Sequence, residues 1–177
     1  QVPGLTGQHP DEPLIPCAGA VVVDGAGRFL LVRRAHPPAQ GKWSIPGGRV
    51  EPGETGEQAV VRELLEETGL AGEVVREVGD VLRPAPGGGT YVIRDFEVRV
   101  PEGSMAVAGD DAADARWVTP QQLEQIDTSE GLVDALLGQH QVAHPVVIEG
   151  HQRVRKHREF IQCGVCLLAA AAAFEAE

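Results

Sequence analysis

The sequence has few cysteines and no apolar run long enough for a membrane span. Its three cysteines, Cys17, Cys163 and Cys166, are too few and too unevenly spaced for a disulfide framework. The apolar stretch at residues 160–174 is shorter than the ~20 residues that a spanning helix needs, and residues 1–16 lack the basic and apolar segments of a signal peptide. These absences exclude disulfide-rich secreted and membrane-spanning proteins and predict a soluble, cytoplasmic one.

Basic side chains are also scarce. The chain carries 15 lysines and arginines against 26 acidic residues, which gives a formal charge of -11. Such a charge repels nucleic acid and anionic lipid, so we expect neither as a partner. An acidic protein that binds phosphate groups needs a metal ion to offset this repulsion.

Aromatic residues make up only 4% of the chain, but the apolar share of 42% and the charged share of 23% are typical of a globular protein. A length of 177 residues fits one domain with a terminal extension. Residues 1–15 are rich in proline and glycine, which favours a flexible N-terminal arm. No repeat is visible.

The expected elements alternate between strands and helices. β-prone runs occupy residues 18–23 and 29–34, with a glycine-containing turn at 24–27 that predicts an antiparallel hairpin; a helix is expected at 55–67, strands at 73–82, 90–100 and 115–118, and a second helix from 120 to about 137. This order predicts an α/β (α+β) fold, a mixed sheet with helices on its faces.

The helix at 55–67 carries the clearest chemical signal. Thr55 and Gln58 have the spacing of a capping box. Glu63, Glu66 and Glu67 are three and four residues apart, so their carboxylates share one helical face with neighbouring Cβ atoms ~5 to 6 Å apart. Three like charges this close repel one another. Oxygen ligands of this kind suit Mg²⁺, so the cluster predicts a magnesium site.

Residues around this acidic face have supporting roles. Arg62 lies beside Glu63, where it can orient or partly neutralise the carboxylates, and Glu54 can join the metal site or hold the preceding loop. Gly47 and Gly48 expose backbone atoms that can approach a metal or a phosphate without a side chain in the way.

The spacing of these residues resembles the Nudix box, the sequence signature of the Nudix hydrolases, which is called the box below. The matching positions are Gly48, Glu54, Arg62-Glu63-Leu64, Glu66-Glu67 and Gly69-Leu70. The resemblance extends over about residues 16–138 and leaves 139–177 as a C-terminal extension of unknown role. It implies an α/β/α sandwich in which water attacks a metal-bound diphosphate.

The resemblance also implies roles for individual residues. Glu63, Glu66 and Glu67 would serve as metal ligands or base, with the Gly47 carbonyl as a further ligand and Mg²⁺ as the cofactor, for which Mn²⁺ can substitute. The catalytic base is left open between a box glutamate, Glu63 or Glu66, and an acid of the loop at 109–114.

In that loop the candidate is Asp111, which takes the place of a glutamate found in many relatives. Arg33, Arg34 and Gly48 are expected near the substrate. Arg33 and Arg34 flank the cleft in relatives, and Gly48 belongs to the exposed glycine backbone.

The substrate is expected to be a nucleoside diphosphate linked to another group. Pro86 stands sixteen residues after Leu70, as in relatives that cleave ADP-ribose to AMP and ribose 5-phosphate, so it is a candidate substrate contact. One alternative is a MutT-type enzyme that releases pyrophosphate from 8-oxo-dGTP or another nucleoside triphosphate. Another is a non-catalytic module that senses a nucleotide. A homodimer is left open.

Overall fold

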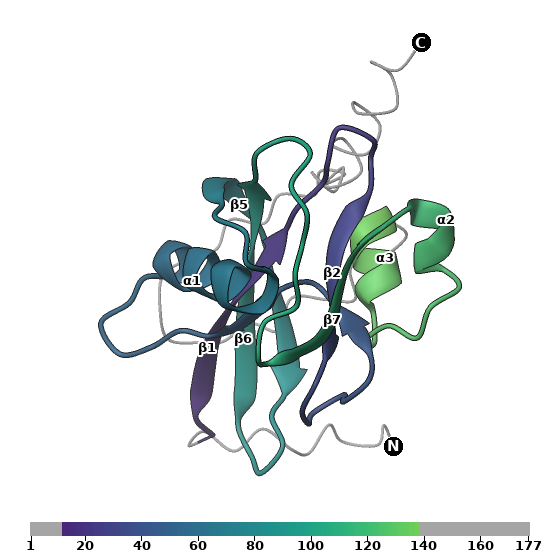
Figure 1. Ribbon diagram of the computed structural model, residues 1–177. Helices are drawn as coiled ribbons and strands as arrows, with labels where there is room; N and C mark the ends of the chain where they lie inside the picture. Colours follow the sequence, from purple (N-terminus) through teal and green to yellow (C-terminus); the bar gives the residue numbers. More distant parts are fainter. Residues whose placement is uncertain (1–11, 139–177) are drawn as a thin grey trace, which may run out of the picture.

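The computed structural model describes residues 12–138, which form two β-sheets with helices on both sides (Figure 1). The elements are β1 (Leu14–Val21), β2 (Phe29–Arg34), β3 (Trp43–Ser44), β4 (Gly47–Arg49), α1 (Gly56–Thr68), β5 (Glu73–Pro84), β6 (Thr90–Arg99), β7 (Ala112–Val118), α2 (Pro120–Leu123) and α3 (Leu132–Leu137). Most of the expected arm, residues 1–11, and the extension at 139–177 lie outside the described residues.

Sheet topology confirms the expected mixed arrangement. One sheet has the order β4-β1-β6-β5, in which β1 and β6 are parallel and the other neighbours are antiparallel. The second sheet, β3-β2-β7, is antiparallel throughout. Strand β4 therefore forms an edge of the first sheet, beside β1.

The expected hairpin between the first two long strands forms only at its turn. Val23 bridges Phe29 on either side of residues 24–27. Beyond that point β1 and β2 enter different sheets, because β1 takes β4 and β6 as its neighbours. The expectation of two antiparallel paired strands was therefore wrong for most of their length.

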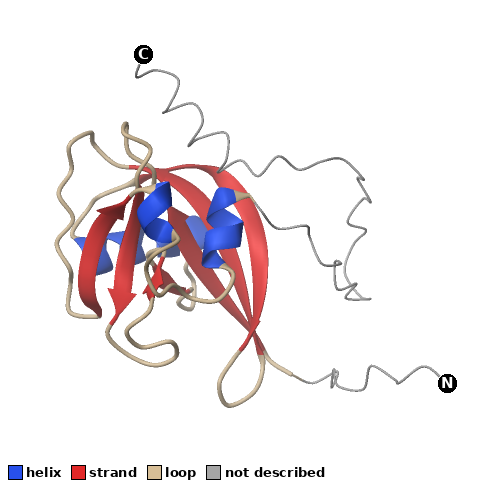
Figure 2. Ribbon diagram, turned by 90° about the vertical axis from the view of Figure 1, so that its right-hand side faces the viewer, coloured by secondary structure: helices blue, strands red, loops and turns tan. Residues whose placement is uncertain are grey.

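Two apolar clusters hold the layers together. The first joins Ala59, Val60 and Leu64 of α1 to the sheet residues Ala18 and Phe96. The second packs α2 and α3 against the opposite faces of the strands; it contains Val21, Phe29, Leu31, Trp43, Val118, Leu123, Leu132 and Leu136. Figure 2 shows α2 and α3 in front of the strands and α1 behind them, which is the expected α/β/α sandwich.

Helix α1 begins and ends close to the positions that the sequence predicts. The Thr55 side chain accepts a hydrogen bond from the Gln58 backbone, the Gln58 side chain accepts one from the Thr55 backbone, and Gly69 ends the helix in the left-handed conformation with φ of 70°. Caps of this kind satisfy backbone groups that a helix leaves unpaired at its ends. They fix which residues of α1 face the core and which face β4.

The second expected helix is instead two short ones. Residues 124–131 separate α2 from α3 because their backbone pairs with β3: Trp43 donates to the carbonyl of Asp127 at 2.8 Å and accepts from the N–H of Ser129 at 2.8 Å. Other strands are longer than expected. β7 begins at Ala112, and β1 begins at Leu14, inside the expected arm. Within residues 12–138 no helix is long and apolar enough to cross a membrane.

Candidate active site

The second half of α1 presents its glutamates to the glycine backbone of β4. The carboxylate of Glu67 accepts a hydrogen bond from the N–H of Gly47 at 2.9 Å. Glu63 lies so close to Gly48 that a Cβ atom at this glycine would collide with the Glu63 carboxylate. The absence of a side chain at Gly48 allows the acidic face of the helix to approach the strand, whereas a Cβ atom at Gly47 would collide with the backbone of β1.

Arg62 joins the box glutamates to the preceding loop. Its guanidinium binds both carboxylate oxygens of Glu54, at 2.9 and 3.0 Å. The same group donates to Glu63 at 2.9 Å, to Glu66 at 3.1 Å and to the carbonyl of Arg49 at 3.0 Å. Paired, two-oxygen contacts of this type are directional, so Arg62 fixes the loop on the helix.

Burial and mutual repulsion affect the ionisation of these carboxyl groups. Burial raises the pKa of Glu67 to about 7, against the lowering effects of the Gly47 N–H and the Arg34 charge. Burial also raises the pKa of Glu63, while Arg62 opposes the change. The hydrogen bonds from Arg62 lower the pKa of Glu54. The two box glutamates nearest β4 are therefore costly to ionise without additional positive charge.

A hard divalent cation fits this donor set. Residues 12–138 contain no three acidic, histidine or cysteine side chains already gathered around one point. Arg62 holds Glu63 and Glu66, while Glu67 turns to Gly47. Even so, the face offers several carboxylates and a glycine carbonyl, the ligand types that Mg²⁺ prefers, and the raised pKa values mark carboxylates that a cation would stabilise in their charged form.

Two of the other expected site residues lie near Glu67. Arg34, at the end of β2, is close enough to lower the Glu67 pKa, and Asp111 is close enough to raise it. Asp111 is largely exposed, and its Oδ1 atom lies 3.9 Å from the Nε2 atom of His36. Arg33, in contrast, is exposed.

Pro86 is not brought to the box glutamates. It lies exposed in the turn between β5 and β6. The register pairs Leu14 with Thr90 and Gly19 with Asp95, so the turn lies five strand residues, roughly 16 Å, from the Gly19 position. Its role in substrate binding stays a prediction.

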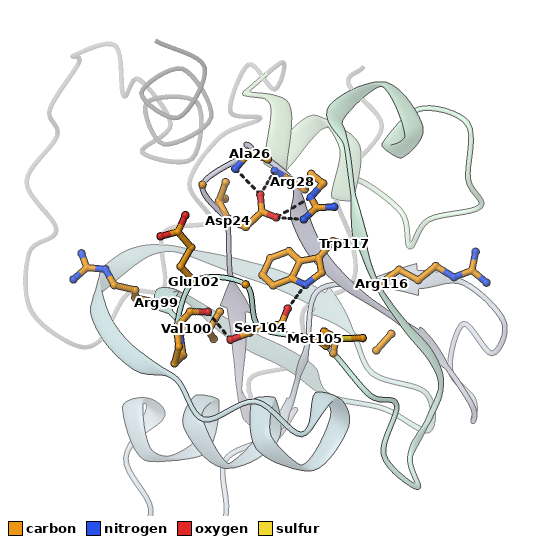
Figure 3. A pocket seen from close by; sticks show the side chains of 16 residues that line it. Asp24, Ala26, Arg28, Arg99, Val100, Glu102, Ser104, Met105, Arg116 and Trp117 are labelled. Atoms are coloured by element: carbon orange, nitrogen blue, oxygen red, sulfur yellow. Dashed lines mark hydrogen bonds and ion pairs between the residues drawn. The ribbon is translucent and has the colours of Figure 1, made fainter. Parts of the chain in front are cut away.

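A cavity of about 1150 Å³ is separate from the acidic face, since no box glutamate lines it. Its walls are the β1–β2 turn, the end of β6 with residues 100–106, and part of β7 (Figure 3). Trp117 forms one wall, and its indole N–H donates to the Ser104 carbonyl at 3.0 Å. This contact explains how the aromatic ring is held in place.

Sequence reasoning did not single out Asp95, in the middle of β6. Among residues 12–138, its Oδ1 is the one buried side-chain oxygen without a hydrogen-bond partner. The available signal was an aspartate within a strand whose neighbours Phe96 and Val98 are core residues.

Comparison with known protein families identifies the domain that contains this site. Residues 13–136 match the NUDIX domain. The chain belongs to the Nudix family.

Relatives within the Nudix family have different named substrates. The chain is 38% identical over 111 residues to an ADP-ribose pyrophosphatase of Methanocaldococcus jannaschii, covering 60% of this chain and 66% of the relative. It is 35% identical over 106 residues to a candidate 8-oxo-dGTP diphosphatase of Bacillus subtilis, covering 60% and 67%. The matched segment thus spans about two thirds of each relative. Both names support the expected class, a Nudix pyrophosphohydrolase.

The fold has solved counterparts. The crystal structure of a MutT protein from Methanosarcina mazei superimposes with a TM-score of 0.61 at 25% identity, covering 70% of this chain and 90% of that one. This likeness confirms the expected Nudix sandwich.

Proposed function

We propose that this Nudix protein is a Mg²⁺-dependent pyrophosphohydrolase that cleaves ADP-ribose to AMP and ribose 5-phosphate. The observation that carries the reaction class is the acidic face of α1, with Glu63 and Glu67 set against the side-chain-free backbone of Gly47 and Gly48. The charge of a diphosphate beside these carboxylates requires a cation there.

Glu63, Glu66 and Glu67, with the carbonyl of Gly47, would hold the metal. When bound, Mg²⁺ would neutralise charge on the diphosphate as the P–O bond breaks. Arg62 keeps the loop before α1 against these carboxylates through its contacts with Glu54.

The remaining steps belong to the protein's own groups. Water attacks one phosphorus, the anhydride P–O bond breaks, and the other phosphate leaves with the bonding electrons. A box glutamate or Asp111 accepts the proton of the attacking water. Arg34, which lies near Glu67, supplies a positive charge that attracts the phosphates.

The choice of ADP-ribose rests on similarity to the Methanocaldococcus jannaschii enzyme. A second candidate is the release of pyrophosphate from 8-oxo-dGTP, because the Bacillus subtilis relative matches the chain to a similar extent. The box binds the diphosphate that both substrates share, so other parts of the protein must distinguish them.

The test is a hydrolysis assay with ADP-ribose, 8-oxo-dGTP and dGTP at equal concentrations in Mg²⁺, with the products separated by chromatography. We expect AMP and ribose 5-phosphate from ADP-ribose at the highest kcat/KM. A higher kcat/KM for 8-oxo-dGTP, with pyrophosphate as product, would replace this substrate by the second candidate. No hydrolysis of any of the three would contradict the proposal.

A further inference from the structure

Arg49 is the last residue of β4 and directly follows the two box glycines. Gly48 pairs with Ala18 on the face of the sheet that α1 covers, and a Cβ atom at Gly48 would meet the Glu63 carboxylate. Because successive side chains of a strand point to opposite faces, the Arg49 side chain lies on the face turned away from α1. Its Cα atom is two residues from Gly47, roughly 7 Å.

The guanidinium of Arg49 is held in place by Tyr91. Its Nη2 atom donates a hydrogen bond to the phenol oxygen of Tyr91 at 3.2 Å, and its central carbon lies 5.7 Å from the centre of the ring. Tyr91 belongs to β6, so the arginine side chain extends over β1 to reach it. The carbonyl of Arg49 accepts a hydrogen bond from Arg62 at 3.0 Å. Backbone and side chain of Arg49 are therefore both oriented before any ligand binds, which lowers the entropy cost of binding.

The charge of Arg49 is not used by a carboxylate. Within residues 12–138, Arg49 makes no ion pair, although its side chain is exposed and the whole chain has a formal charge of -11. Other arginines of this part of the chain do contact carboxylates; they are Arg28, Arg62, Arg76, Arg94 and Arg116. An exposed, oriented guanidinium beside the box is thus available to an anion from solution.

A second arginine adds positive charge on the other side of Tyr91. Arg83 of β5 pairs with Tyr91 in the strand register, so both side chains lie on the same face of the sheet. The Arg83 guanidinium donates to the carbonyls of Leu82, at 3.3 Å, and of Glu130, at 3.1 Å. Like Arg49, Arg83 has no ion pair with a carboxylate among the described residues. The face around Tyr91 is therefore positively charged in an otherwise acidic protein.

Arg49 is also close to the box in electrostatic terms. Burial raises the pKa of the Cys17 thiol, the Arg49 charge lowers it, and the Glu63 charge raises it. Both charges therefore lie within electrostatic range of one sulfur atom. Arg34 acts on Glu67 in the same way from β2. A substrate held through a metal ion at the box has an arginine near it on β4 as well as on β2.

We propose that Arg49 is a substrate-binding residue whose guanidinium binds a phosphate group of the substrate, and that Tyr91 is a positioning residue that acts through Arg49. A guanidinium binds phosphate oxygens through paired, charge-assisted hydrogen bonds. The assignment rests on the proposed function in that it needs a substrate with phosphate groups. ADP-ribose and 8-oxo-dGTP both have them, so it holds for either substrate.

The experiment measures kcat and KM for whichever of these two substrates is hydrolysed. The variants are Arg49→Met, which removes the charge at similar volume, Arg49→Lys, which keeps the charge without the planar guanidinium, and Tyr91→Phe. The matched control is Arg99→Met, which alters an exposed arginine at the last residue of β6. Thermal unfolding checks that each variant is folded, which we expect because both arginines are exposed.

We expect Arg49→Met to raise KM by about tenfold or more and to leave kcat nearly unchanged, since a hydrogen bond to a charged group is worth at least that factor and uniform binding affects KM alone. Arg49→Lys should raise KM by less, because it retains the charge. Arg99→Met should keep the wild-type KM. An unchanged KM in Arg49→Met, or a loss confined to kcat, would overturn the assignment of Arg49.

The role of Tyr91 has its own test. Tyr91→Phe keeps the ring but removes the acceptor for Arg49, so we expect KM to rise by roughly 2- to 10-fold. In the double variant with Arg49→Met, the loss should be no greater than in Arg49→Met alone, because the two residues act as one unit. Losses that multiply in the double variant would show that Tyr91 does not act through Arg49.

Binding measurements separate this inference from the proposed function. Calorimetric titration with pyrophosphate in Mg²⁺ reports phosphate binding without turnover, and Arg49→Met should weaken it about tenfold or more. If no substrate is hydrolysed but pyrophosphate binding depends on Arg49 in this way, the proposed function fails and the role of Arg49 stands. Equal binding to the wild type and to Arg49→Met, or no binding to the wild type, would overturn that role.

Discussion

The carboxylate of Glu67 lies 2.9 Å from the backbone nitrogen of Gly47, and this hydrogen bond joins the last turn of α1 to the first residue of β4. It places the Glu67 carboxylate, a possible metal ligand, against the glycine backbone that we expect a phosphate group to approach. The same contact holds Glu67 in a partly buried position, where its ionisation is costly. Stability and activity should therefore respond in opposite directions to changes at this residue.

Replacing Glu67 by glutamine should stabilise the metal-free protein at alkaline pH. Because the folded-state pKa of Glu67 is raised from 4.5 to about 7, the unfolded chain loses its proton first as the pH rises. As the pH rises from 4.5 to about 7, the free energy of unfolding therefore falls, by at most about 3 kcal/mol. Urea unfolding in EDTA at pH 4 and pH 8 measures the effect.

At pH 8 the Glu67→Gln variant should have the higher free energy of unfolding, and at pH 4 the two proteins should be nearly equal. Glu57→Gln, which changes an exposed glutamate in the first turn of the same helix, is the control and should show no such gain. A Glu67→Gln variant that is less stable than the wild type at pH 8 would contradict the account.

Arg62 should not be replaceable by lysine. A lysine cannot contact both oxygens of Glu54 and reach Glu63 and Glu66 as well, because it lacks the planar guanidinium. We expect Arg62→Lys to lower kcat/KM by roughly 10- to 100-fold, as for other residues that orient metal ligands, and to raise the Mg²⁺ concentration needed for half-maximal activity.

A matched control is Arg76→Lys, which alters an arginine paired with Glu97 across β5 and β6. This variant should leave both the rate and the Mg²⁺ dependence unchanged. If Arg62→Lys had the same kinetics as the wild type, the contacts of Arg62 with Glu63 and Glu66 would not be needed to position these carboxylates.

Gly19 should tolerate no side chain. A Cβ atom there would collide with the Asp95 carboxylate and lie 2.8 Å from the Ile45 side chain. We expect Gly19→Ala to lower the free energy of unfolding by about 1 to 3 kcal/mol, the usual cost of overpacking. Gly79→Ala, at the other neighbour of Asp95, has open space and should change little. Equal stabilities of the two variants in urea would refute the close packing between Gly19 and Asp95.

The sequence predicted the parts of the fold that local signals determine. Helix α1 was predictable because its start and stop depend on Thr55, Gln58 and Gly69, which act within one turn. The acidic face was predictable for the same reason, since a spacing of three and four residues is meaningful only on a helix.

Features that depend on distant partners were not predictable. The break between α2 and α3 arises because residues 127–129 pair with Trp43, far away along the chain. The divergence of β1 from β2 depends on β6, which follows some seventy residues later. Asp95 became conspicuous only when the registers placed it between Gly19 and Gly79.

The most direct test of the central claim is the rate of ADP-ribose hydrolysis as a function of Mg²⁺ concentration, measured for the wild type and for Glu67→Gln in parallel. We expect saturable, EDTA-sensitive activity in the wild type and a rate reduced by roughly 100-fold or more in the folded variant. A Glu67→Gln variant that keeps most of the activity, with an unchanged Mg²⁺ dependence, would contradict the assignment of the box glutamates as the metal site.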